Sequence, residues 1–452
     1  MARATENVLL LGALCAAGYF GWQQWKPRPA SAPSPTPPPP SQGVPAPPPP
    51  APVAVPPVRV EVVEEVAGIA PSDIQAAQAL TTRLNAREPL FSADLRVAEE
   101  LLERHPAEPR LRELLEATLV TLATQDRSQR RFPEAVTQLR RAIDVSPQSP
   151  APRKALVMVL LDASDWTGAE AAAREALALL PRDPELLEAF AYSLFRQDRN
   201  RDALEAFRAV LQVADSANAR AYIARLEKNS RDEGGMTEQR LSHFHVRYDG
   251  EEHLEVGREI LRALERHYAT LTTTLDHQPS EAIAVILFSR EAYYSASGAP
   301  RWSGGVFDHT DGRIRIPIGG LDTRLTPDID NVVVHELTHA FVHDRSRGGS
   351  PREIHEGLAQ WMEGKRLDSE YDARSLKALA SGRAAGVAAY YALALGLVDY
   401  LQSVRGQGGL NDVLRLIGEK GDVDAAFRDV YGEDFKSTQQ RFFERLRQRH
   451  GS

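Results

Sequence analysis

The segment His335-Glu336-Leu-Thr-His339 is the part of the sequence whose residue types and spacing point most directly to chemistry. On an α-helix a step of four residues turns about 400°, so His335 and His339 lie on one face and can bind the same metal ion. Glu336 lies beside them, where its carboxylate can reach water near that ion. The spacing therefore predicts a hydrolytic metal site, with zinc as the expected metal. The alternative is two surface histidines on an amphipathic helix.

Two helices are expected to position this site. Thr326-Pro-Asp328 supplies a capping residue, a proline at the first helical position and an early acidic residue, which predicts a helix that runs through the motif to about Arg345. Ser350-Pro-Arg-Glu353 has the form of a capping box. A second helix is therefore expected to begin there, to return antiparallel to the first and to end before Gly364.

The second helix is expected to supply the third metal ligand. Glu356 lies early in it, 17 residues after His339, and a carboxylate at this place can complete a site of two histidines and one glutamate. Glu353, Glu363 and His343 lie on nearby helical faces, so geometry alone leaves them open as alternatives. Spacing favours Glu356.

The motif together with Glu356-Gly-Leu-Ala resembles the gluzincin metallopeptidases, in particular the bacterial peptidase MA-like domains. The similarity extends from about His243 to Arg447. The resemblance implies a thermolysin-like α+β domain in which His335, His339 and Glu356 bind Zn²⁺. It also implies that Glu336 is the general base of peptide hydrolysis.

Further positions bear on the resemblance. Tyr391 matches a tyrosine of related domains, which implies an oxyanion donor, although aromatic residues at helical spacing are often core residues. His355 occupies a place where asparagine is frequent, and Gln360 offers no carboxylate to orient a ligand histidine. Arg313 to Ile316 alternates polar and apolar residues before Pro317, which predicts an exposed edge strand along which an extended substrate can bind. The alternative is a strand that is covered by its own loops.

Upstream of this domain, helical residues recur with a period of 34. This pattern resembles the tetratricopeptide repeat, with units near Glu116–Ser149, Pro150–Asp183 and Pro184–Ala217 after a degenerate capping unit. Stacked units form a concave surface, so residues 71–229 are expected to bind a protein substrate or partner; a structural spacer is the alternative. The residues that share the period are Ala135, Ala169 and Ala203, then Leu139, Ala173 and Phe207, and Ala142, Ala176 and Val210.

Residues 1–58 are expected to hold the folded part at a membrane. The run Val8–Trp22 is almost uninterrupted in its apolar character and approaches the ~20 residues that span a bilayer, which predicts a membrane helix within residues 1–26. A cleaved signal peptide is the alternative. Residues 27–58 are rich in proline, alanine and serine, a composition of extended linkers. The soluble part is expected to be extracytoplasmic, in the periplasm.

Composition limits the other possibilities. The chain has 452 residues, 42% of them hydrophobic, which suffices for two or three domains. Its formal net charge of -8 supplies no basic field for phosphate backbones, so nucleic acid is not an expected partner. The single cysteine, Cys15, lies in the apolar N-terminal run, so any metal must be held by histidine and carboxylate groups.

The predicted fold class is α+β. It combines an N-terminal membrane helix (1–26), a Pro-rich linker (27–58), an all-α tetratricopeptide-like solenoid (71–229) and a thermolysin-like metallopeptidase domain (240–450). The predicted function is peptide-bond hydrolysis by a membrane-tethered zinc peptidase whose repeats recruit a protein substrate. The alternative is a non-catalytic scaffold or assembly factor that retains the metallopeptidase fold. An intact Glu336 disfavours that alternative.

Overall fold

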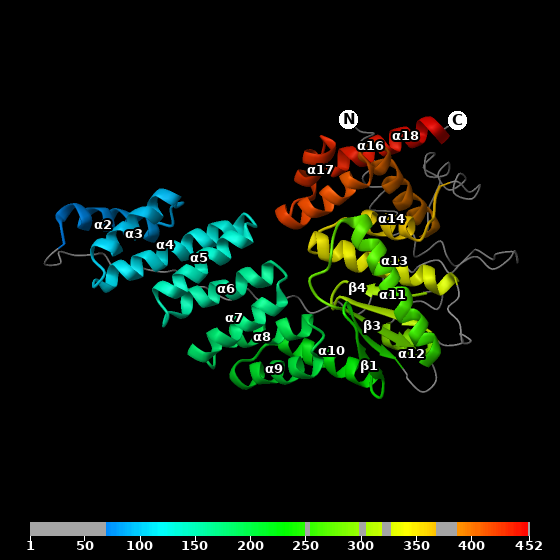
Figure 1. Cartoon of the computed structure of the whole chain (residues 1–452), viewed down its shortest axis with the longest axis horizontal. Coiled ribbons are helices and arrows are strands. Elements are labelled where there is room, and N and C mark those ends of the chain that lie inside the picture. Colours follow the sequence, from blue (N-terminus) through cyan, green and yellow to red (C-terminus); the bar gives the residue numbers. More distant parts are fainter. Residues whose placement is uncertain (1–68, 249–253, 298–303, 319–326, 368–386, 451–452) are drawn as a thin grey trace, which may run out of the picture. The chain divides into compact units, whose positions relative to one another are not determined.

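A computed structural model describes most of the chain after the N-terminal region (Figure 1): residues 69–248, 254–297, 304–318, 327–367 and 387–450. The chain divides into two compact units, with the boundary between Arg231 and Asp232. The membrane helix and linker predicted for residues 1–58 lie outside the described residues. No described helix is long and apolar enough to cross a membrane.

The first unit is built from helices in its described part. Helices that follow one another pack in pairs, α4 with α5, α6 with α7 and α8 with α9. Proline occupies one of the first two helical positions in α2, α4, α5, α6 and α8, where a missing N–H leaves no hydrogen bond unmade. The helices are α2 (Pro71–Asn85), α3 (Ser92–Arg104), α4 (Pro109–Ser128), α5 (Phe132–Val145), α6 (Pro150–Asp162), α7 (Trp166–Leu179), α8 (Pro184–Arg196), α9 (Asn200–Val213) and α10 (Ala217–Asp232).

The 34-residue period of the sequence is present in this unit. Helices α5, α7 and α9 begin at residues 132, 166 and 200. Two positions before each start, Arg130, Ser164 and Asp198 have left-handed φ angles of 57°, 60° and 59°. The nine residues predicted to share the period are all fully buried: Ala135, Ala169, Ala203, Leu139, Ala173, Phe207, Ala142, Ala176 and Val210. Equivalent buried side chains, six of them alanine, thus let equivalent helices pack closely. Assignment to the tetratricopeptide family stays a prediction.

The second unit contains a five-stranded sheet with the strand order β1-β2-β3-β5-β4. Strands β2, β3 and β5 are parallel, and β1 and β4 pair antiparallel at the two edges. Every residue of β3 is buried, as a central parallel strand requires. The strands are β1 (Thr237–Arg240), β2 (Phe244–Tyr248), β3 (Ile283–Phe288), β4 (Val306–Asp308) and β5 (Arg313–Pro317).

Helix α13 runs through the core of the second unit. It contacts α11, α14 and α16 as well as strands β4 and β5, and every residue from Val332 to Val342 is buried. The alternative of two surface histidines on this helix is therefore wrong. The helices of this unit are α11 (Leu254–Leu275), α12 (Arg290–Ser297), α13 (Pro327–Ser346), α14 (Arg352–Met362), α16 (Val387–Lys420), α17 (Val423–Tyr431) and α18 (Phe435–His450).

The predicted fold class, α+β with a thermolysin-like metallopeptidase domain, is wrong. The described residues are 73% helical, with 16 helices and a few short strands, and they do not show a thermolysin-like fold. The fold class rested on motif residues that belong to α13 and α14. Two helices determine where the motif residues lie relative to one another, but they do not determine how the remaining elements are arranged.

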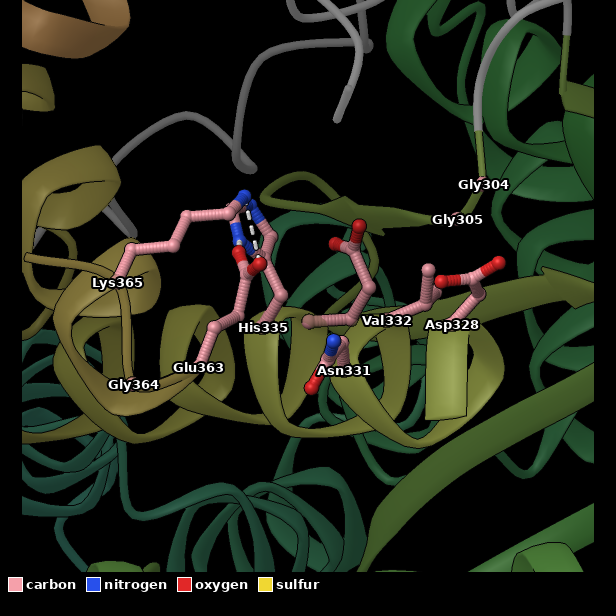
Figure 2. Close-up of a pocket in the computed structure, with 10 residues that line it drawn as sticks. Gly304, Gly305, Asp328, Asn331, Val332, His335, Glu363, Gly364 and Lys365 are labelled. Atoms are coloured by element: carbon pink, nitrogen blue, oxygen red, sulfur yellow. Dashed lines mark hydrogen bonds and ion pairs between the residues drawn. The ribbon is translucent and has the colours of Figure 1, made fainter. Parts of the chain in front are cut away.

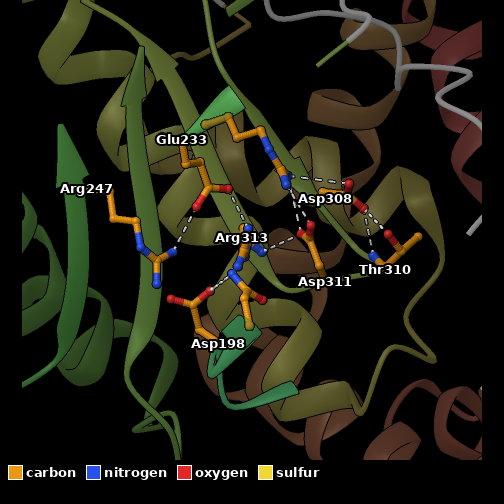
Figure 3. A network of polar contacts seen from close by, with 9 residues as sticks. Asp198, Glu233, Arg247, Asp308, Thr310, Asp311 and Arg313 are labelled. Carbon is orange, nitrogen blue, oxygen red and sulfur yellow. Dashed lines mark hydrogen bonds and ion pairs between the residues drawn. The ribbon is translucent and has the colours of Figure 1, made fainter. Parts of the chain in front are cut away.

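The prediction that Arg313 to Ile316 forms an exposed edge strand is also wrong. This segment is β5, which lies between β3 and β4, so β4 and not β5 is the edge strand on this side of the sheet. The Arg313 side chain is only 1% exposed. It donates a 2.7 Å hydrogen bond to Glu233, which also accepts one from Arg247 at 3.2 Å (Figure 3). Buried ion pairs thus produce the polar alternation that we interpreted as exposure.

Candidate active site

The sequence at both ends of α13 sets the position of the motif. Pro327 begins the helix, and Asp328 in the first turn complements the positive end of the helix dipole. The helix ends at Ser346, just before Gly348 with a left-handed φ of 72°. The predicted end near Arg345 is confirmed to within one residue. The predicted capping residue, Thr326, lies outside the described residues.

Helix α14 follows after a short loop, but without the predicted capping box. It begins at Arg352, and the residue before it, Pro351, makes no side-chain capping hydrogen bond. The backbone N–H of Ser350 instead donates a 3.3 Å hydrogen bond to the hydroxyl of Ser346, the last residue of α13. The predicted stop is confirmed, because the helix ends at Met362 and Gly364 has a φ of 84°.

His335, His339 and Glu356 bring three potential metal-ligand atoms together. The Nε2 atoms of the two histidines are 3.1 Å apart, and Oε2 of Glu356 is 3.7 Å from the first and 3.8 Å from the second. A point equally distant from these three atoms in their plane lies about 2.1 Å from each of them. Imidazole and carboxylate groups bind first-row metal ions at about this distance. The predicted residues can therefore hold a metal ion.

An unpartnered oxygen supports the same interpretation. Oε2 of Glu356 is buried and has no hydrogen-bond partner among the described residues. A buried polar group without a partner costs about 1–3 kcal/mol, and more when it is charged. Because both imidazole nitrogens lie beyond hydrogen-bond distance, an ion among the three atoms is the partner that this oxygen lacks. The chemistry of the donor set thus fits a metal ion.

Glu363 is a site residue whose role we missed in the sequence. Its carboxylate contacts Nδ1 of His335, the ring nitrogen outside the three-atom group, and Lys365 Nζ lies 2.6 Å from its other oxygen (Figure 2). Such a contact fixes the orientation of a ligand histidine. Burial opposes a charge on His335, but the neighbouring carboxylates of Glu363, Glu356 and Glu336 together raise the pKa of His335. Two helical turns separate Glu363 from Glu356, and that spacing was the available signal.

The other predicted alternatives lie outside the three-atom group. His343 approaches His309, with 3.4 Å between their Nδ1 atoms. Glu353 lies in the first turn of α14. Gln360 supplies no carboxylate, as expected, and its amide instead donates to the backbone oxygen of Tyr391 at 3.0 Å. Another residue, Glu363, provides the carboxylate that contacts the ligand histidine His335.

Glu336 lies in a pocket beside His335. Burial, opposed by the charge of His335, raises the pKa of Glu336 to about 7, and the backbone N–H of Phe307 in β4 donates a hydrogen bond to its carboxylate. A carboxylate with such a pKa can accept and return a proton near neutral pH. The pocket is lined by Gly304, Gly305, Asp328, Asn331, Val332, His335, Glu336, Glu363, Gly364 and Lys365 (Figure 2).

Two glycines allow neighbouring elements to approach the helices that carry the site. A Cβ atom on Gly305 would lie 2.8 Å from Val332 and 3.0 Å from Glu336, so the start of β4 can rest on α13. A Cβ atom on Gly357 would lie 2.3 Å from the backbone oxygen of Ala394, so α14 can approach α16. Strand β4 therefore packs closely against α13, and α14 packs closely against α16, next to His335, His339 and Glu356.

Tyr391 lies on α16 and is buried, with 5% of its surface exposed. Burial raises the pKa of Tyr391, and the charges of Glu356 and Glu336 raise it further. These two carboxylates act on the tyrosine because α16 packs against α13 and α14. The residue is thus both a core residue and a neighbour of the site, while its role as an oxyanion donor stays a prediction.

Comparison with known proteins indicates the class of protein to which the second unit is similar. The model of a family described as "Peptidase of plants and bacteria" matches residues 256–441, which include α13, α14 and the group of His335, His339 and Glu356 that could hold a metal ion. Among curated proteins, none matches the chain. The family match supports a peptidase domain in the second unit, and therefore a hydrolase. It covers neither the helical pairs of the first unit nor the choice of metal.

Proposed function

We propose that this protein is a zinc-dependent peptidase in which Glu336 is the general base. The observation that carries the proposal is the convergence of His335, His339 and Glu356, with an unpartnered Oε2 on Glu356, beside the pocket of Glu336. The peptidase family match supports the reaction class.

The donor set favours zinc over other common ions. Two imidazoles and one carboxylate, with room for a further ligand, form a typical catalytic zinc site. Calcium requires six to eight oxygen ligands at about 2.3–2.6 Å, and magnesium also prefers oxygen, so the two histidines disfavour both. A zinc ion, when bound, supplies Lewis-acid chemistry that polarises a carbonyl group and makes water more acidic.

The residues of the chain perform the proton transfers in this proposal. Glu336 accepts a proton from the attacking water and later delivers it to the leaving amine nitrogen. Its pKa of about 7 suits both steps, because the carboxyl group is then neither fully charged nor fully neutral near neutral pH. Glu363 keeps the His335 ring oriented, and Tyr391 is the proposed donor to the developing oxyanion.

Strand β4 is the proposed binding edge for an extended substrate. It forms the end of the sheet, and its residue Phe307 donates a backbone hydrogen bond to Glu336. A peptide added along such an edge uses main-chain hydrogen bonds, which are independent of side-chain identity. The scissile bond of a substrate bound there lies near the general base.

The helical pairs of the first unit are proposed to recruit a protein substrate or partner. The support is their regular 34-residue arrangement, because stacked helical hairpins present extended surfaces for polypeptides. The membrane-anchored, periplasmic location remains a prediction from residues 1–26. The non-catalytic scaffold is disfavoured, since Glu336 is retained in a pocket with a pKa suited to proton transfer.

The test measures metal content and activity in the same samples. Purified protein is assayed for bound zinc and for hydrolysis of a denatured protein, before and after removal of metal by a chelator and again after zinc is restored. We expect activity to disappear with the metal and to return with zinc. Hydrolysis that is unaffected by complete metal removal would contradict the proposal.

A further inference from the structure

A buried arginine holds the turn between strands β4 and β5. Arg315 lies on β5, and its guanidinium donates a 2.6 Å hydrogen bond to one carboxylate oxygen of Asp311 and contacts the other oxygen at 3.3 Å. The same guanidinium approaches the carboxylate of Asp308, the last residue of β4, at 3.5 Å (Figure 3). One cation thus joins β5, the turn and β4.

The two aspartates also fix the backbone of this turn. The carboxylate of Asp308 accepts a 2.9 Å hydrogen bond from the backbone N–H of Thr310. The carboxylate of Asp311 accepts one from the backbone N–H of Arg313 at 3.1 Å. Because each aspartate binds the turn backbone and faces Arg315, the Arg315 side chain is coupled to the path of the chain from β4 to β5.

Stability alone does not account for this ion pair. The side chains of Arg315 and Asp311 are both buried, with 7% and 0% exposed. Apolar side chains of similar volume often stabilise a fold as well as a buried ion pair does. A buried pair does fix one local arrangement, because any other arrangement leaves a charge without its partner.

The hairpin leads directly to the candidate active site. Strand β4 has three residues and lies at the end of the strand order, where it pairs with β5. The backbone N–H of its central residue, Phe307, donates to the carboxylate of Glu336. A Cβ atom on Gly305, just before the strand, would lie 3.0 Å from Cγ of Glu336. The place of the β4 backbone beside Glu336 therefore depends on its pairing with β5 and on the turn.

We propose that Arg315 is a positioning residue, which holds the β4–β5 hairpin so that the β4 backbone stays against Glu336. The proposal rests on the function proposed above, in which Glu336 is the general base and an extended substrate binds along β4. Arg315 acts through Asp308 and Asp311 and not through the metal-binding group. Loss of its contacts therefore displaces the binding edge while the metal ligands stay in place.

The variants separate this role from a general effect on folding. Arg315→Lys keeps the positive charge but removes the planar fork that reaches both aspartates. Arg247→Lys is the matched control, because Arg247 lies in the same row of the sheet two strands away and pairs with Glu233 outside the hairpin. Asp308→Asn weakens the same contacts at a half-buried residue, so the test remains available if Arg315→Lys does not fold.

Two measurements on the full-length protein test the proposal. Hydrogen exchange, followed by mass spectrometry, reports the opening of β4. Loss of a hydrogen bond to a charged group shifts a local opening equilibrium by about 10-fold or more, so we expect β4 to exchange at least about 10-fold faster in Arg315→Lys and in Asp308→Asn, but not in Arg247→Lys.

The second measurement is the KM for an extended peptide at matched zinc content. Partial unfolding lowers kcat without changing KM, because the molecules that stay folded bind substrate as before, whereas a displaced binding edge raises KM. We expect KM to rise by roughly 10-fold in Arg315→Lys, the effect of about one lost hydrogen bond to a charged group, and to be unchanged in Arg247→Lys.

Unchanged exchange of β4 in Arg315→Lys and Asp308→Asn would overturn the proposal. Faster exchange with an unchanged KM, or equal effects in Arg247→Lys, would also overturn it. If the parent hydrolysed no peptide while β4 exchange still depended on Arg315, the function proposed above would fail and the role of Arg315 in holding β4 would stand.

Discussion

Replacement of Glu363 by glutamine tests whether its contact with His335 prepares the metal site. The amide has nearly the same size as the carboxylate, so packing at the end of α14 is preserved. The change removes the negative charge that faces Nδ1 of His335 and Nζ of Lys365. His335 then loses its charged acceptor, and its ring is held less firmly in the orientation that directs Nε2 toward the metal.

The expected loss follows from the geometry of these contacts. Removal of such an outer contact typically reduces metal affinity by 10- to 100-fold, which corresponds to about 1.4–2.8 kcal/mol. Both carboxylate oxygens of Glu363 have a cationic or N–H partner, whereas an amide offers only one oxygen. We therefore expect zinc affinity to fall by at least about 10-fold.

The assay is competition for zinc with a chelator of known affinity, followed by the melting of the zinc-free proteins as a check on folding. Glu353→Gln is the matched control, because it makes the same chemical change on the same helix outside the metal-binding group. An unchanged affinity of Glu363→Gln, or an equal loss in Glu353→Gln, would refute the reasoning.

Three further predictions address packing, buried charge and recruitment. Gly357→Ala should lower the free energy of unfolding by about 1–3 kcal/mol, because the added Cβ would meet the backbone of α16. Gly408→Ala is the control and should not lower it, because open space surrounds that position. Equal effects of the two variants in urea unfolding would contradict this prediction. Glu233→Gln should cost about 3–5 kcal/mol, because it removes the charged carboxylate that pairs with two buried arginines. Glu419→Gln at an exposed pair should cost at most about 1 kcal/mol in the same measurement. Deletion of residues 69–231 should slow hydrolysis of a protein substrate without slowing that of a short peptide, and equal slowing would argue against recruitment.

The convergence of His335, His339 and Glu356 was predictable because its determinants are local. His335 and His339 are one helical turn apart, so their shared face follows from helix geometry alone. Glu356 required only a short connection to the next helix, which Gly348 and the helix start at Arg352 provide. The repeating positions of the first unit were predictable for the same reason, because a fixed period places equivalent side chains in equivalent environments.

The contacts that were missed depend on long-range packing. Arg313 and Glu233 are 80 residues apart, and only the folded sheet shows that both are buried. The edge position of β4 depends on strand order, which a strand of three residues does not reveal in the sequence. His309 approaches His343 across 34 residues and from a loop. The overall fold class failed for the same reason, because motif residues constrain only their own two helices.

The central claim is that Glu336 carries the proton in a metal-dependent peptidase, and Glu336→Gln tests it most directly. Glu336 lies outside the three-atom metal group, so the variant should retain zinc and the folded structure. The amide can neither accept a proton from water nor return it to the leaving nitrogen. At matched zinc content, hydrolysis of a peptide substrate should therefore fall by about 10²- to 10⁴-fold. A zinc-loaded Glu336→Gln protein that cleaves as fast as the parent would contradict the account.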